Sequence, residues 1–327
     1  MKNLKGTFIL LLAAFIWGTA FVAQTSAGDN IGAFTFNACR NIIGALFLFV
    51  VIAILDMRKY SDRNDNPGEN NYNIDKKNYI INKKNYLTNA KKWPIKEGVI
   101  CGILLCIAMN LQQIGINTYP DGVAVSGFLT ATYVVMIAIA SVFMGQKLHK
   151  LTIIAAFVCI AGMYLLCIAG GINEIYVADI LELMCAVAFT IHMFTVDKYD
   201  KADGVKLSCI QFLTSGILSG ILMLIFDKAD INSIMKAIIP ILYAGVMSSG
   251  IAYTFQIIGQ KYAKPSVTAI VLSLESVFAA LAGWILLGEH LSTRELTGCI
   301  LVFTAVIIAQ IPQFAHNVDD SKQQVIE

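Results

Sequence analysis

The chain has 327 residues, of which 57% are hydrophobic and only 14% are charged, and its formal net charge is +2. A soluble globular domain carries about a quarter of its residues charged and rarely contains long uncharged runs, so this composition excludes that class. The small net charge gives no indication of a nucleic-acid partner. A bilayer core of roughly 30 Å needs about 20 apolar residues per helix, and runs of this length recur along the whole chain. We expect a polytopic membrane protein surrounded by a lipid bilayer.

Ten apolar segments follow one another along the chain, and each is continuous. Strands of a membrane barrel would instead alternate apolar and polar residues over about ten positions, so we expect helices. The first segment follows Lys2 and Lys5, but its apolar core is longer than that of a signal peptide, and we keep it as a span. The predicted fold is all-α, with ten transmembrane helices at 5–25, 32–55, 98–118, 122–144, 150–170, 177–196, 207–226, 234–258, 265–287 and 294–312.

The placement of Lys and Arg orients these predicted helices. If the N-terminus is cytoplasmic, the cytoplasmic segments hold 20 of these residues and the outer loops hold 3, while Arg40 lies within the second span. Cytoplasmic loops of membrane proteins are enriched in basic residues, so we expect both termini in the cytoplasm and a location in the inner or plasma membrane.

Half of the 20 cytoplasmic basic residues belong to the polar insertion at 56–97. Its Asn-, Lys- and Asp-rich composition predicts a disordered or loosely held segment on the cytoplasmic face. Two interpretations remain open. The insertion is either a low-complexity segment without function, or its stretch "YIINKKNYL" lies on the anionic leaflet.

Neither the cysteines nor any short motif indicates catalysis. All eight cysteines lie in apolar segments without a CxxC pair, which is typical of small packing side chains rather than disulfides or metal ligands. The chain has no HExxH, no GxSxG and no phosphate-binding loop. We therefore expect no enzyme, no metal, no cofactor and no self-contained ATP-driven pump.

An internal repeat divides the chain into two halves. Shifted by 143 residues, 112–148 aligns with 255–291, and the helix ends and glycines coincide. Five helices per half would give the halves opposite orientations, and the loops fit this, because "TYPDGV" contains no lysine while its counterpart "KYAKPS" contains two. Inverted repeats are typical of secondary transporters, although channels also contain duplicated halves. The predicted units are 1–170, 171–315 and a cytoplasmic tail at 316–327.

Several segments carry a family resemblance: "FIWGTAFVAQ", "FNACRNIIGALFLF", "NLQQIGINTYPDGVAVSGFLTATYVVM" and "SLESVFAALAGWILLGEHLSTRELTGCILVFTAVIIAQ". Together they resemble the EamA-type members of the drug/metabolite transporter superfamily. The resemblance covers nearly the whole chain except 56–97, and the last stretch is the most specific. It implies a ten-helix carrier of small organic metabolites, often an exporter, with both termini in the cytoplasm.

One departure from the family concerns proline. Relatives often have a proline in the fourth and ninth helices, but 122–144 and 266–287 contain none. Any hinge that the family derives from this proline must come from glycine or packing here.

Glu275 is the most informative polar residue, because it lies about ten residues from either end of its predicted span. An ionised side chain at mid-membrane costs about 2.5–3.5 kcal/mol and by default faces the bundle interior. Glu275 must therefore be protonated, paired or exposed to an aqueous cavity. It either titrates as a proton-coupling site, binds a substrate ammonium, or caps a neighbouring helix. Since the resemblance implies a glutamate here in carriers of different substrates, we favour a shared role in folding or gating.

The other candidate residues fall into two groups. The first group carries charge: Arg40, which needs an acid, carbonyls or water because guanidinium stays protonated, and Glu182. We favour an ion pair or an interfacial anchor for Arg40 over anion binding. The second group consists of candidate cavity residues, for which interhelical hydrogen bonding or packing is the alternative: Trp17, Asn110, Gln113, Tyr133, His192, Tyr253 and Gln256.

These observations predict a secondary transporter of small organic metabolites, such as amino acids, that works by alternating access about a central cavity. Export is the expected direction, and protons are a candidate coupling ion. The rival hypotheses are a channel-like facilitator and a membrane-embedded enzyme or sensor. Substrate identity and oligomeric state lie beyond the sequence.

Overall fold

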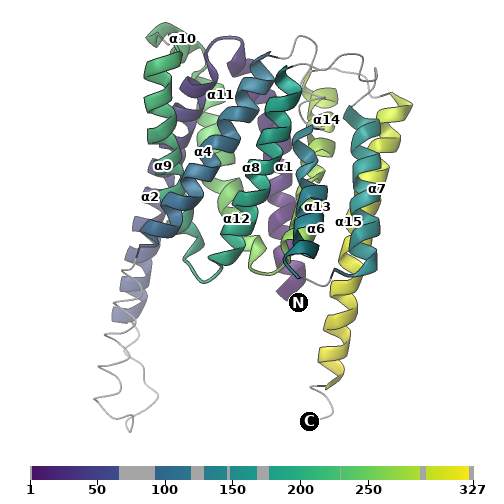
Figure 1. The fold of residues 1–327 in the computed structure, drawn as a ribbon. Coiled ribbons are helices and arrows are strands. Elements are labelled where there is room, and N and C mark those ends of the chain that lie inside the picture. Colours follow the sequence, from purple (N-terminus) through teal and green to yellow (C-terminus); the bar gives the residue numbers. More distant parts are fainter. Residues whose placement is uncertain are drawn as a thin grey trace.

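The computed structural model describes residues 2–65, 93–118, 129–145, 148–167, 177–228, 230–287 and 292–323, and these form helices without any strand (Figure 1). The helices are α1 (Lys2–Gly28), α2 (Ala33–Asp65), α4 (Ile95–Thr118), α6 (Tyr133–Phe143), α7 (Lys150–Cys167), α8 (Val177–Lys198), α9 (Gly204–Phe226), α10 (Ile231–Lys236), α11 (Ile238–Tyr243), the π-helix η1 (Ala244–Ala252), α12 (Tyr253–Gln260), α13 (Pro265–Leu272), α14 (Leu274–Leu287) and α15 (Thr293–Gln323).

The all-helical membrane fold is confirmed. By length and composition, eight helices of the described chain are able to cross a membrane. Two shorter apolar helices, Leu129–Phe143 and Lys150–Leu166, lie at the predicted fourth and fifth spans. Both of these predicted spans include residues outside the described ranges, so the number of ten membrane-spanning helices stays a prediction.

The helices next to the polar insertion and the tail are longer than predicted. Helix α2 continues to Asp65, into the segment predicted as a loose insertion, and α15 continues to Gln323, into the predicted tail. The apolar pattern marks where a helix crosses lipid, but a helix can extend beyond the bilayer as a polar helix. The rest of the insertion, from 66 to 92, lies outside the described residues.

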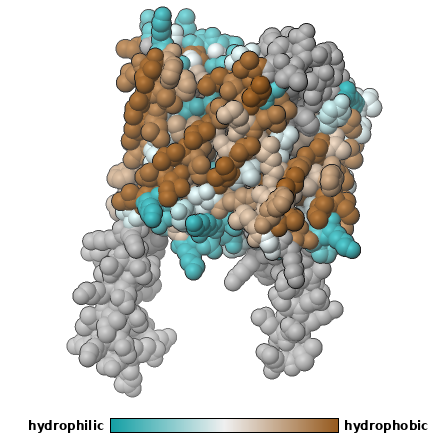
Figure 2. All heavy atoms as spheres, viewed as in Figure 1, coloured by the Kyte–Doolittle hydropathy of each residue, from teal (hydrophilic) through white to brown (hydrophobic). Residues whose placement is uncertain are grey.

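Apolar side chains cover the flank of the helical bundle. Figure 2 shows brown side chains across the middle of this face and teal ones towards its upper and lower ends. Large side chains such as Phe15, Phe49, Phe157 and Ile285 are more than half exposed. A soluble monomer rarely exposes apolar patches of this extent; contact with lipid tails explains them.

Both ends of the chain lie on the same side of the bundle, where α1 begins and α15 ends, while α10 lies on the opposite side (Figure 1). This side also holds the Lys198–Gly204 connection between α8 and α9 and the Gln260–Pro265 connection between α12 and α13. These connections contain lysines. We call this side the terminal side below, and it is the side that the sequence predicts to be cytoplasmic.

Glycines allow a close helix contact between α7 and α15. A Cβ atom added to Gly162 would lie 2.9 Å from the Gly298 carbonyl oxygen, and one added to Gly298 would lie 2.6 Å from the Gly162 carbonyl oxygen. Small residues let membrane helices approach closely, which favours association by van der Waals packing. The other extensive contacts pair α2 with α9, α4 with α8 and α9, and α1 with α14.

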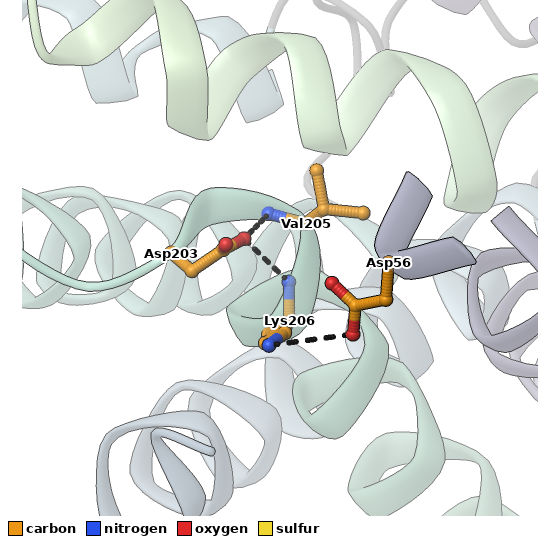
Figure 3. A network of polar contacts seen from close by, with 4 residues as sticks. All are labelled: Asp56, Asp203, Val205 and Lys206. Carbon is orange, nitrogen blue, oxygen red and sulfur yellow. Dashed lines mark hydrogen bonds and ion pairs between the residues drawn. The ribbon is translucent and has the colours of Figure 1, made fainter. Parts of the chain in front are cut away.

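Polar caps fix the ends of α2 and α9. At the terminal side, the Asp203 carboxylate accepts hydrogen bonds from the backbone N–H groups of Val205 and Lys206, at 3.0 and 3.2 Å, and so caps α9. The Lys206 ammonium lies 3.9 Å from the Asp56 carboxylate of α2 (Figure 3). At the other side, Asp227 accepts hydrogen bonds from the backbone N–H and hydroxyl of Thr35, both at 2.7 Å. Side-chain contacts thus join α2 and α9 at both ends.

Asp230 caps α10 on the side away from the termini. Ser233 donates its backbone N–H and its hydroxyl to the Asp230 carboxylate, at 2.8 and 3.1 Å. These donors stabilise the ionised form, so they hold the pKa of this exposed carboxyl below its usual range.

Two helices are interrupted at hydroxyl residues instead of prolines. The α-helical pattern is broken at Thr132, before α6, and at Ser273, between α13 and α14. The two residues have nearly the same backbone angles, φ −59° and ψ −15° against φ −61° and ψ −15°. Each hydroxyl donates to the carbonyl three residues earlier, Leu129 and Ile270, at 2.6 Å. Such back-bonding bends helices, so hydroxyls supply the interruptions that we expected to come from glycine or packing.

The contact between α7 and α15 yields a stability prediction with a matched control. Gly298→Ala should lower the free energy of unfolding by about 1–3 kcal/mol, because the new methyl group overlaps the α7 backbone. Gly220→Ala in α9 should leave stability unchanged or raise it by up to about 1 kcal/mol, because nothing lies within 4 Å of the added carbon. Thermal unfolding in detergent measures both, and equal midpoints for the two variants would contradict this packing.

Candidate functional site

A cavity that is partly open to solvent lies between the helices. Helices from both predicted halves of the chain contribute to it: α1, α2, α4 and α6 from the first half, and α8, η1, α12, α13 and α14 from the second. The residues that line it are Trp17, Phe21, Gln24, Arg40, Gln112, Thr130, Tyr133, Phe189, Met193, Ser248, Tyr253, Gln256, Leu272 and Glu275.

Aromatic side chains form much of the cavity wall. Trp17, Phe21 and Gln24 recur at helical spacing and therefore share one face of α1. The rings of Trp17 and Tyr253 meet edge to face, with centroids 4.6 Å apart, and Phe212 supports Tyr253 from behind at 5.3 Å. Edge-to-face pairs are favourable beyond their buried area, so this part of the wall is held in place by its own contacts.

Glu275 lies in the first turn of α14, directly after the interruption at Ser273. Its side chain is partly exposed and lines the cavity. Over the described ranges, no hydrogen bond or ion pair engages its carboxylate. Close packing fixes its position, because a Cβ added to Gly18 of α1 would lie 2.7 Å from the Glu275 carbonyl oxygen. The cavity thus contains a carboxylate that is available to a ligand or a proton.

Arg40 of α2 lines the same cavity, although only 2% of its surface is exposed. Its Nη1 donates to the Gln24 side-chain oxygen at 3.0 Å, and its guanidinium lies 5.3 Å from the centroid of the Phe36 ring. No carboxylate of the described chain lies within 4.0 Å of it. Its charge is therefore held by an amide and a ring, and the ion pair that we favoured is not formed among these residues.

Three buried side-chain atoms around the cavity have no hydrogen-bond partner in the described part of the protein: Trp17 Nε1, Arg40 Nε and Gln256 Oε1. The first two are donors, and the third is an acceptor. An unsatisfied buried polar atom costs about 1–3 kcal/mol. The cavity therefore presents hydrogen-bonding capacity that the surrounding helices leave unused.

The cavity is closed towards the terminal side. The Gln256 amide donates to Gln260 at 3.3 Å, and Gln260 donates to the Met193 carbonyl oxygen at 3.2 Å, which links α12 to α8. Beyond them lies a buried apolar cluster of Cys101, Val196, Leu207 and Ile257. In the other direction, the lining extends to Gln24, Arg40 and Gln112, which lie near the helix ends remote from the termini.

Asn110 and Gln113 lie outside the cavity lining. The Asn110 amide donates to Ser219 and to the Cys106 carbonyl oxygen, both at 2.8 Å, and accepts from Asn37 at 3.1 Å. Gln113 is fully buried and donates to Asn117 at 2.9 Å. Both side chains make interhelical or local hydrogen bonds, which was the alternative that we left open for them. Their counterparts in the repeat, Tyr253 and Gln256, line the cavity.

His192 and Glu182 also lie behind the lining. His192 Nε2 is hydrogen-bonded to the Gln211 side-chain oxygen at 3.1 Å, towards α9. The Glu182 carboxylate accepts a hydrogen bond from Thr130 at 2.5 Å, and Thr130 itself lines the cavity. Of the predicted candidates, the structure thus brings together Trp17, Arg40, Tyr133, Tyr253, Gln256 and Glu275 at the cavity.

Several lining residues were not predicted from the sequence: Gln24, Gln112, Thr130, Phe189, Met193, Ser248 and Leu272. Gln24 and Gln112 are amides within predicted spans, so the cost of a polar group in lipid was a usable signal for them. The apolar residues carried no such signal, because any residue of a helical bundle faces either lipid or protein.

Asn110 and Gln256 allow a test of which polar residues belong to the cavity. Asn110→Ala should lower the free energy of unfolding by about 1 kcal/mol, because it removes interhelical hydrogen bonds, and should leave ligand affinity unchanged. Gln256→Ala should weaken ligand binding instead. Ligand-dependent melting curves separate the two effects. A tenfold loss of affinity in Asn110→Ala at unchanged stability would move Asn110 into the site.

Comparison with known proteins adds family information to this geometry. The model of the EamA-like transporter family matches residues 4–70 and 177–310. An uncharacterized transporter of Archaeoglobus fulgidus is 27% identical over 314 residues, which cover 95% of this chain and 87% of the relative. A second uncharacterized transporter of the same organism is 21% identical over 138 residues, or 42% of this chain and 49% of the relative.

A crystal structure shares the fold with a TM-score of 0.70 at 16% sequence identity. The match covers 94% of this chain and 96% of the other. At this identity the similarity is evidence for the fold alone, and it extends over both halves of the sequence.

Proposed function

The chain belongs to the EamA-like transporter family, and from this premise we propose that it is a secondary transporter that moves small organic metabolites by alternating access about the central cavity. It is a multi-pass membrane protein with a general transport function. The observation that carries the proposal is the position of Glu275, a carboxylate without a protein partner among the described residues, in a cavity lined by helices from both halves of the chain.

The pairing of the helices supports two equivalent halves, 1–170 and 171–315. Exchanging the halves replaces α1 by α8, α4 by the segment from α11 to α12, and α6 by α13 and α14. The contacts of α1 with α12 and with α14 then correspond to those of α8 with α4 and with α6. The exchange also replaces α2 by α9 and α7 by α15, so the contact of α2 with α9 and that of α7 with α15 are each left unchanged. Such a relation is typical of carriers whose two repeats rock about a central site.

The closed terminal side of the cavity supports alternating access. A cavity that is bounded towards the terminal side by Gln256, Gln260 and Met193 fits one of the two states that such a carrier needs. With the termini in the cytoplasm, this state faces outward. We propose export as the direction of transport and protons as a candidate coupling ion, because Glu275 provides a titratable group within the pathway.

Two rivals predict different behaviour. A channel-like facilitator needs a continuous path, whereas the described helices close the cavity at the terminal side. A membrane-embedded enzyme or sensor predicts turnover of a lipid or metabolite in sealed vesicles without net flux.

Transport by purified protein in sealed vesicles tests the proposal. Uptake of a substrate from a panel of amino acids, nucleosides, polyamines and drugs should saturate and should show counterflow. Glu275→Gln should lower this flux at least tenfold, because it removes the charge or proton site from the cavity. The matched control, Glu97→Gln at the start of α4, should transport normally. Non-saturating flux without counterflow would favour a channel, and normal flux in Glu275→Gln would contradict the role of this residue.

The orientation has its own test. A cysteine introduced at the exposed position Asn232, in α10, should react with a membrane-impermeant thiol reagent in intact cells. A cysteine at the exposed position Asp200, between α8 and α9, should react only after permeabilisation. The opposite labelling pattern would place the termini outside the cell.

A further inference from the structure

We propose that Ser208 and Gln211 of α9, together with His192 of α8, line a second passage that is closed in this structure and that joins the cavity to the terminal side in the other state of the carrier. All three side chains are buried here. The inference rests on the transport function proposed above, and it names the hydrogen-bonding groups that the cargo meets between the cavity and the terminal side.

The contacts between α2 and α9 show which residues of the two halves are equivalent. Asp56 of α2 contacts Lys206 near the start of α9 (Figure 3), and Asp227 at the end of α9 contacts Thr35 near the start of α2. Thr35 and Lys206 are 171 positions apart, and so are Asp56 and Asp227. The same pair of equivalent positions is therefore in contact twice, once on each side of the bundle.

Polar atoms without a hydrogen-bond partner in the described chain occur at equivalent positions. Three pairs of buried side chains each contain such atoms: Asn37 and Ser208, Arg40 and Gln211, and Gln113 and Gln256. The first two pairs are 171 positions apart, and the third follows the shift of 143 that applies after the insertion at 56–97. An unsatisfied buried polar atom is costly. Its recurrence in both halves indicates groups that meet water or cargo in one of the two states.

The two members of a pair lie towards opposite sides of the bundle. Asn37 is the fifth residue of α2, which begins at the side remote from the termini, and Ser208 is the fifth residue of α9, which begins at the terminal side. Arg40 already lines the cavity, whereas its equivalent Gln211 is fully buried. The first half of the chain thus presents its set to the cavity in this state, and the second half keeps most of its set closed.

Gln211 and His192 lie directly behind the cavity wall. The Gln211 side-chain oxygen is hydrogen-bonded to His192 Nε2 at 3.1 Å. Their neighbours along the chain belong to the wall or support it, because Met193 lines the cavity and Phe212 packs on Tyr253 of the lining, with ring centroids 5.3 Å apart. A displacement of α8 against α12 would therefore expose the Gln211–His192 pair to the cavity.

A polar link holds α8 and α12 together beside this pair. Gln260 donates to the Met193 carbonyl oxygen at 3.2 Å. Its equivalent in the first half, Asn117, donates to the Ile31 carbonyl oxygen at 3.5 Å and so joins the end of α4 to the chain after α1. The link at the terminal side is the shorter of the two, which fits a state that is bounded on that side. Its release would open the passage.

Cysteine accessibility tests the passage. Asp200→Cys, at its exposed position, identifies the terminal side. A small membrane-impermeant thiol reagent should modify Ser208→Cys from that side and not from the other, whereas Gln112→Cys, at the cavity, should react from the other side. Leu213→Cys, on the lipid-exposed face of α9, should react from neither side. Labelling of the unmodified protein gives the background to subtract.

Two amide variants should change these rates in opposite directions. Gln260→Ala removes the link at the terminal side, so it should raise the rate of Ser208→Cys about fivefold, the effect of removing one hydrogen bond from one of two states, and lower the rate of Gln112→Cys. Asn117→Ala, the matched control, should have the reverse effect. If Gln260→Ala does not fold, Ser208→Cys, which replaces one oxygen by sulfur, decides the question through the side from which it reacts.

Three results would overturn the passage. Ser208→Cys that reacts from neither side, or only from the side remote from the termini, would do so and would leave the transport function intact where counterflow persists. Equal reaction of Ser208→Cys and Leu213→Cys would indicate a loosened α9 instead of a passage. The expected labelling in protein that shows neither flux nor counterflow would support the passage and contradict transport.

Discussion

A charged or hydrogen-bonding group inside a bilayer has no water to satisfy it, so it must find a partner in the protein, in a wet cavity or in a ligand. This constraint organises the bundle. The helices are joined by polar contacts such as those of Asn37, Asn110 and Ser219 between α2, α4 and α9. Each contact of this kind contributes only about 0.6 kcal/mol on average, but it removes a larger cost of leaving the groups unpaired.

The same constraint distinguishes the charged cavity residues from the polar residues that join the helices. Arg40 and Glu275 both line the cavity, and no ionic partner lies within 4.0 Å of either among the described residues. Other polar side chains within the helices meet partners on neighbouring helices, as Asn41 meets Ser215 and Ser249. The contrast separates residues that hold the helices together from residues whose partner must come from outside the protein.

Much of the fold was predictable because lipid imposes a simple length and composition on each span. All ten predicted segments coincide at least in part with helices, and eight of these helices meet the length and composition of a membrane span. Arg40 and Glu275 were identifiable because a charge in lipid is costly wherever it occurs. The sequence did not predict which amide side chains line the cavity and which are packed between helices. Gln256 lines the cavity while its counterpart Gln113 is packed away, and the difference depends on how each helix is rotated against its neighbours.

The irregular backbone segments also could not be predicted from the sequence. The π-helix η1 lies where Gly44 of α2 approaches Ser249 closely, and one of its residues, Ser248, lines the cavity. Nothing in the apolar pattern of this segment indicates a wider turn. The absence of proline in the ninth span was visible in the sequence. The interruption of the helix at Ser273, just before Glu275, was not.

The hydroxyl interruptions at Thr132 and Ser273 differ from a proline kink in their chemistry. A proline permanently removes a backbone donor, whereas a side-chain hydroxyl competes for a carbonyl oxygen and can release it. Each of these two helices therefore retains every amide needed to become a regular helix. The bend depends on a single rotatable C–O group in each half, so its energy can be adjusted by neighbouring side chains such as Cys159, whose sulfur lies 3.0 Å from the Ser273 hydroxyl. In the carrier proposed above, a substitution at Ser273 or Cys159 would therefore change the backbone directly beside Glu275.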